Sequence, residues 1–87
     1  MIKAKVQENV DEIIQALNAF KEDEALPKNI KIKIDTIIST INEDSDVSTK
    51  IGKSLHILDE ISEDPNIPPF LRPNVYHISS LLEKLNH

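Results

Sequence analysis

The chain has 87 residues and a formal net charge of −5, which is enough for one small domain and disfavours general binding to polyanions. Apolar residues make up 39% and charged residues 29% of the sequence, as in an ordinary soluble protein. The absence of cysteine excludes disulfides, thiolate nucleophiles and cysteine-based metal sites.

Aliphatic residues at helical spacing and a single glycine indicate an all-α chain, because tight β-hairpins normally need several glycines. The first helix is predicted over about residues 2–22, and its apolar stripe is Val6, Val10, Ile13, Leu17 and Phe20. After a turn over residues 23–26, Pro27 suits the first position of a second helix. The stripe of that helix is Ile30, Ile34, Ile37, Ile38 and Ile41.

The second half of the chain predicts two more helices. Residues 42–46 form a polar break with several N-cap candidates, and the third helix follows over about residues 47–62. Gly52 lies inside it, and we interpret it as a position where a neighbouring helix approaches closely. Pro65 ends this helix. The fourth helix carries the stripe Leu71, Val75, Ile78, Leu82 and Leu85, with a kink or a separate short turn near Pro73.

The two turns that contain proline share one pattern. Residues 20–31 and 61–72 both read apolar-x-Glu-Asp-x-x-apolar-Pro-x-x-apolar-basic, at an offset of 41 residues. This predicts a single domain over residues 1–87, a four-helix bundle of two αα-hairpins (residues 2–44 and 46–86) that form an approximate HEAT-like internal repeat. Each turn places an acid at a helix C-terminus and a base near the next N-terminus, against the helix dipole. Ion pairs between Asp23 and Lys31 and between Asp64 and Arg72 would resolve both conflicts.

The block Leu58-Asp59-Glu60-Ile61-Ser62-Glu63-Asp64-Pro65-Asn66-Ile67-Pro68-Pro69 resembles the small archaeal proteins grouped as uncharacterised protein family 0147. Residues 10–17 and the turn through Pro27 fit the same pattern, and the resemblance covers roughly residues 8–86. It implies a compact fold of about four helices and an archaeal, cytoplasmic source. It implies no activity and carries over no catalytic or ligand residues.

No residues form a recognisable catalytic, cofactor or metal site. His56, His77 and His87 lack the spacing of metal ligands and are interpreted as surface residues. Ser79 and Ser80 lie within a predicted helix without a glycine elbow, and no glycine loop is present to bind phosphate. We therefore expect a protein that is not an enzyme and has no cofactor.

Two features suggest partners. Apolar residues outside the main stripes predict self-association, with a dimer favoured, or a protein partner; they are Ile32, Ile57, Leu81, Leu26 and Ile67. The other interpretation is that these residues broaden the core of a monomer. Two lysine groups give the alternative of contact with nucleic acid or the ribosome; they are Lys28, Lys31 and Lys33, and Lys50 and Lys53. Nucleic acid is disfavoured because aromatic residues for base stacking are missing.

These features together predict a helical protein–protein interaction or structural module. No run approaches the roughly 20 apolar residues of a membrane span, and the expected location is the cytoplasm.

Overall fold

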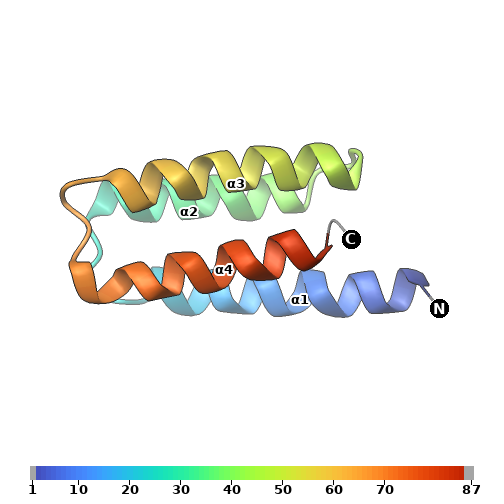
Figure 1. Cartoon of the computed structure of the whole chain (residues 1–87), viewed down its shortest axis with the longest axis horizontal. Coiled ribbons are helices and arrows are strands. Elements are labelled where there is room, and N and C mark those ends of the chain that lie inside the picture. Colours follow the sequence, from blue (N-terminus) through green and yellow to red (C-terminus); the bar gives the residue numbers. More distant parts are fainter. Residues whose placement is uncertain (1, 86–87) are drawn as a thin grey trace.

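The computed structural model describes residues 2–85, with side chains for residues 9–85. The elements are α1 (Ile2–Lys21), α2 (Lys28–Ile41), α3 (Val47–Glu63), the short 3-10 helix η1 (Pro69–Leu71) and α4 (Arg72–Leu85). Consecutive helices run antiparallel (Figure 1). Within residues 2–85 there is no strand, so the predicted all-α four-helix bundle is confirmed.

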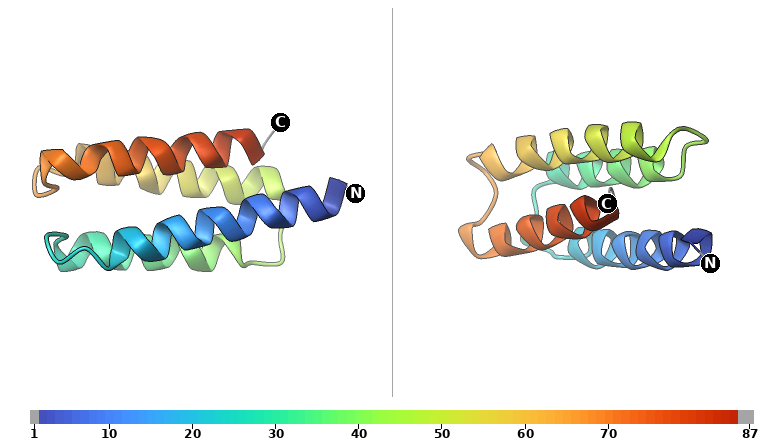
Figure 2. Two further views of the ribbon diagram at one scale, coloured as in Figure 1. Left: turned by 90° about the horizontal axis from the view of Figure 1, so that it is seen from below. Right: turned by 45° about the vertical axis from the view of Figure 1, so that its right-hand side comes forward.

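The helices form a closed ring. Each helix packs against two neighbours: α1 against α2 and α4, and α3 against α2 and α4. The two proline turns lie at one end of the bundle, whereas the α2–α3 turn lies at the other end, where α1 begins and α4 ends (Figures 1 and 2). The ring therefore has four seams, the surface lines along which two neighbouring helices meet.

The core is aliphatic and follows the predicted stripes. Among residues 9–85, sixteen hydrophobic residues are buried: Ile13, Leu17, Phe20, Leu26, Ile30, Ile34, Ile37, Ile41, Ile51, Leu58, Ile61, Ile67, Leu71, Val75, Ile78 and Leu82. Val10, Ile38, Leu55 and Leu85 are partly buried and pack against this cluster. Val6, which the sequence places on the first stripe, lies outside the described side chains.

The two proline turns contain the same hydrogen bonds. Asp23 Oδ1 accepts from the backbone N–H of Ala25 (2.9 Å), and Asp64 Oδ1 accepts from that of Asn66 (2.8 Å). The same contact thus occurs twice, 41 residues apart. Core residues also correspond at this offset; for example, Leu17 and Leu58 are both fully buried. The HEAT-like character of the repeat stays a prediction, because these contacts do not distinguish it from another pair of αα-hairpins.

The ion pairs predicted within each turn are wrong. Neither Asp23–Lys31 nor Asp64–Arg72 is among the ion pairs of the described side chains. An aspartate can reach the backbone N–H two residues on at little entropic cost, and both turns use their aspartate in this way. The second carboxylate oxygen of Asp64 accepts instead from Asn29 Nδ2 (3.2 Å).

Two proline positions refine the helix boundaries. Pro27 precedes α2 with extended backbone angles, so the helix begins one residue later than predicted. A separate short turn, η1, comes before Pro73. Pro73 then falls within the first turn of α4, where its missing N–H leaves no hydrogen bond unmade.

Gly52 does not mark a close approach of helices, so that interpretation is wrong. It is exposed on α3, and a Cβ built there would meet nothing within 4 Å. The residue points to solvent because it lies next to the buried Ile51 and outside the apolar stripe of α3. The glycine therefore costs helix stability with no packing benefit in the bundle.

Replacing Gly52 with alanine is expected to raise the free energy of unfolding by about 1 kcal/mol, because glycine in a helix interior loses more backbone entropy than alanine. Urea unfolding followed by circular dichroism measures the change. Ser80→Ala, at an exposed position within α4, is the control and should gain only about half as much. A loss of stability in Gly52→Ala would contradict the open surface at this position.

Ser54 is the least expected member of the core. It is 0% exposed, and its hydroxyl has no hydrogen-bond partner among the residues that the structure describes. The residue 41 positions earlier is Ile13, which is also 0% exposed. A buried hydroxyl without a partner costs roughly 1–3 kcal/mol, so one core position of the second hairpin is weaker than its counterpart in the first.

Candidate interaction surface

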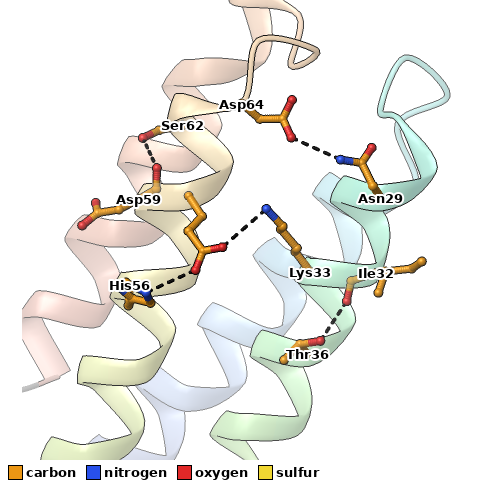
Figure 3. A network of polar contacts seen from close by, with 9 residues as sticks. Asn29, Ile32, Lys33, Thr36, His56, Asp59, Ser62 and Asp64 are labelled. Carbon is orange, nitrogen blue, oxygen red and sulfur yellow. Dashed lines mark hydrogen bonds and ion pairs between the residues drawn. The ribbon is translucent and has the colours of Figure 1, made fainter.

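The α2–α3 seam is covered by polar contacts between side chains (Figure 3). Near the proline turns, Asn29 Nδ2 donates to Asp64 Oδ2 (3.2 Å). One helical turn further along, Lys33 Nζ lies 3.5 Å from Glu60 Oε2, and His56 Nε2 lies 3.2 Å from Glu60 Oε1. Each exposed pair contributes little stability, but together the side chains cover the line where the two helices meet.

The α1–α4 seam occupies the corresponding place 41 residues away, and its residue types differ. The positions that correspond to Asn29, Lys33, Glu60 and Asp64 are Phe70, Asn74, Ala19 and Asp23. Only the aspartate is kept. With Ala19 in place of Glu60 and Asn74 in place of Lys33, no ion pair of the Lys33–Glu60 kind can form across this seam.

A groove lies along the α1–α4 seam as a result. Its volume is about 170 Å³, and it is lined by Ala16, Ala19, Phe20, Asp23, Asn74, His77 and Ile78. Ala16 and Ala19 are too short to fill the space between the helices. Phe70 is 68% exposed, and it lies one helical turn before Asn74. The seam thus combines a shallow hollow with an exposed aromatic ring.

Helical spacing extends both walls of the groove. On α1, Glu12 lies one turn before Ala16, which gives an α1 strip of Glu12, Ala16, Ala19 and Asp23. On α4, the spacing gives an α4 strip of Asn74, His77, Leu81 and Lys84. All eight residues are exposed or half-buried. The α1 strip carries two carboxylates, whereas the α4 strip carries a histidine and a lysine.

The apolar residues predicted to mediate association differ in how far they are buried. Leu26 and Ile67 are buried in the core, and Ile57 and Leu81 are half-buried against it. Ile32 is 56% exposed on α2. Phe70 and Tyr76, which were not among the residues predicted to mediate association, are 68% and 60% exposed. The sequence carries no signal that Phe70 is exposed, because its spacing from the core positions 67 and 71 is typical of a buried stripe.

The lysine groups do not form one basic surface. Lys28, Lys31 and Lys33 lie in the first turns of α2, near the proline turns, whereas Lys50 and Lys53 lie in the first turns of α3, at the opposite end. Lys33 pairs with Glu60, and Lys53 pairs with Glu43 (3.8 Å). Two of the five ammonium groups therefore already face carboxylates, which weakens the nucleic-acid alternative.

The two described histidines lie on different helices. His56 and His77 are exposed, on α3 and α4, and His87 lies outside the described residues. Among the described side chains, no three histidines, aspartates or glutamates come together as metal ligands would. Ser79 is half-buried and Ser80 exposed. None of the helices described has the length and apolar character needed to cross a membrane.

The chain is similar to proteins of a known family. The family model described as "Uncharacterised protein family (UPF0147)" matches residues 1–85. A UPF0147 protein from Archaeoglobus fulgidus is 24% identical over 98% of this chain and 98% of its own length. The UPF0147 protein from Pyrococcus abyssi is 32% identical, over 92% of this chain and 95% of its own.

Solved structures agree with the fold. The crystal structure of a UPF0147 protein from Thermoplasma acidophilum superimposes with a TM-score of 0.85 at 28% sequence identity, and the match covers 93% of this chain and 98% of that one. A crystal structure of a second protein of unknown function gives a TM-score of 0.81 at 31% identity, over 88% of this chain and 89% of that one.

Proposed function

Given that the chain belongs to the uncharacterised protein family UPF0147, we propose that it is a non-enzymatic helical interaction module that associates with a second copy of itself through the α1–α4 groove. The observation that carries this proposal is the contrast between two seams of one bundle. Polar side chains cover the α2–α3 seam, but alanines and a groove of about 170 Å³ occupy the α1–α4 seam.

The charges beside the groove support a second copy as the partner. A two-fold axis parallel to the bundle places the α1 strip of one copy opposite the α4 strip of the other. Glu12 and Asp23 then face a strip that carries His77 and Lys84. An axis perpendicular to the bundle would instead oppose the two acidic strips, which like-charge repulsion disfavours. We therefore propose a parallel dimer.

Apolar contact supplies the remaining driving force. Phe70 is 68% exposed in the monomer, and Leu81 is only half-buried. Aromatic residues that lose their water contacts on association commonly dominate the binding energy of an interface. A two-fold axis parallel to the bundle keeps positions along it, so in the proposed dimer Phe70 lies opposite the end of the partner's α1, at the level of Asp23.

Sedimentation equilibrium over a concentration series tests the proposal. We expect a reversible monomer–dimer equilibrium, and we expect Ala19→Arg to raise the dissociation constant at least tenfold, because the guanidinium fills the groove. Ala19 is exposed, so the variant should stay folded, as circular dichroism checks. Asn18→Arg is the matched control, since it adds the same side chain at the neighbouring exposed position, outside the α1 strip.

Two results would contradict this function. A chain that stays monomeric at every concentration removes the self-association, and equal effects of the two arginine variants remove the groove as its site. Retention on an RNA column at low salt that is lost as salt rises would favour the nucleic-acid alternative instead. The proposed compartment is the cytoplasm, whose reducing conditions suit a chain without cysteine.

A further inference from the structure

A second cavity lies at the other end of the bundle, where the α2–α3 turn meets α1 and the end of α4. Its volume is about 280 Å³. Six of its lining residues are aliphatic: Val10, Ile41, Val47, Ile51, Leu82 and Leu85. We call it the end pocket. An apolar cavity of about 150 Å³ is large enough to bind benzene, so the end pocket has room for an apolar group about twice that size.

Two polar residues complete the end pocket, Asn42 and Lys50. Among the described side chains, Lys50 is the one charged residue in its lining, and it is half-buried. A lysine in this setting packs its methylene groups along apolar neighbours and keeps its ammonium at the rim. The described lining therefore combines aliphatic side chains with one cationic residue.

Two acidic residues of the α2–α3 turn, Asp46 and Glu43, are engaged with other partners. Asp46 Oδ2 caps α3, since it accepts from the backbone N–H and the hydroxyl of Thr49 (3.0 Å each). Glu43 pairs with Lys53. Among the side chains described, none forms an ion pair with Lys50. The Lys50 ammonium is thus available to an anion, and the capped end of α3 is not.

We propose that the end pocket binds an aliphatic carboxylate of medium chain length. The chain of the ligand lies among the aliphatic side chains, and its carboxylate accepts hydrogen bonds from Lys50 Nζ and the Asn42 side-chain amide. A single ammonium matches a single negative charge, which favours a carboxylate over a doubly charged phosphate. This site does not depend on the α1–α4 groove, which lies nearer the proline turns.

Titration with octanoate, followed by the methyl NMR signals of the intact protein, tests the proposal. We expect saturable shifts of the Ile41, Ile51 and Leu82 methyl groups. Lys50→Met keeps the apolar stem and removes the charge, and it should weaken binding about fivefold or more, since a hydrogen bond to a charged group is lost. Lys53→Met is the matched control one turn away, outside the pocket, and it should bind octanoate as the natural sequence does.

Octanol, which has an alkyl chain like that of octanoate but no carboxylate, separates the contribution of the ligand's charge to binding from that of its alkyl chain. It should bind the natural sequence more weakly than octanoate by about the factor that Lys50→Met loses, and the preference for octanoate should vanish in Lys50→Met. Ala19→Arg, which blocks the proposed dimer groove, should leave octanoate binding unchanged. Shifts that do not saturate, equal binding of octanoate and octanol to the natural sequence, or an equal loss in Lys53→Met would each overturn the end-pocket proposal.

Discussion

Ile13→Ser is expected to destabilise the bundle by roughly 4 kcal/mol, the sum of a lost aliphatic side chain and a buried hydroxyl without a partner. Ile13 is 0% exposed, and the residue 41 positions later, Ser54, is already a buried serine. A domain of this length has a total stability of about 4–13 kcal/mol, so a second buried serine removes a large part of it. Urea unfolding followed by far-UV circular dichroism measures the loss.

Two control variants separate the effect of the lost side-chain volume from that of the buried hydroxyl. Ile13→Val removes one methylene without adding a polar group, and it should cost only about 1 kcal/mol. Ile14→Ser introduces the same hydroxyl at the adjacent half-buried position, where water can reach it, and it should also cost much less. If Ile13→Ser proved as stable as Ile13→Val, the core would have to relax around a hydroxyl more easily than its burial indicates.

Leu58→Ala is expected to cost about 3 kcal/mol, because the cavity left by a fully buried leucine is only partly closed by relaxation. Leu58 is 0% exposed on α3, and α3 packs against α2 of the first hairpin as well as α4 of its own. The loss should therefore lower the stability of both hairpins together. Chemical denaturation should show one transition, with the midpoint lowered and the slope unchanged.

Leu55→Ala is the control for Leu58→Ala on the same helix. Leu55 is half-buried, so less apolar surface is lost, and about half the cost is expected. Two separate transitions in Leu58→Ala would show that the hairpins unfold independently, contrary to a shared core. An equal cost at both positions would contradict the observed difference in burial.

The helices were predictable from the sequence because apolar residues spaced three and four apart form a continuous face only when the chain is helical. The four helices and nearly all of their inward residues follow from spacings of three and four. Two exceptions among the described side chains are Thr40 and Ser54, whose burial cannot be read from their residue types. A serine at a stripe position is equally compatible with a solvent-facing position if the stripe is narrow.

Contacts between polar side chains were harder to predict. From the helix dipole, Asp23 and Asp64 were predicted to form ion pairs with Lys31 and Arg72. Both aspartates do accept hydrogen bonds, but from other partners. Asp64 instead uses a neighbouring backbone N–H and Asn29, a residue from the other hairpin. Such a choice depends on which helices lie side by side, and the sequence alone does not supply this information.

The candidate surface was predictable only in part, because it arises from two strips on different helices. Leu81 was recognised as lying outside the main stripe, but the groove beside it depends on Ala16 and Ala19 from α1. An alanine on a helix surface carries no signal of its own. Its significance appears only when the seam that it borders is compared with the one that Lys33 and Glu60 cover.

The α2–α3 turn lies at the end of the bundle where α1 begins and α4 ends, and residues 42–46 of this turn are all exposed. Opening the backbone in this turn and joining the end of α4 to the start of α1 with a linker would give a circular permutant with the helix order α3–α4–α1–α2. Both proline turns and all four seams would survive that rearrangement. The order in which the two hairpins are synthesised is therefore a property of the gene and not a requirement of the packed structure.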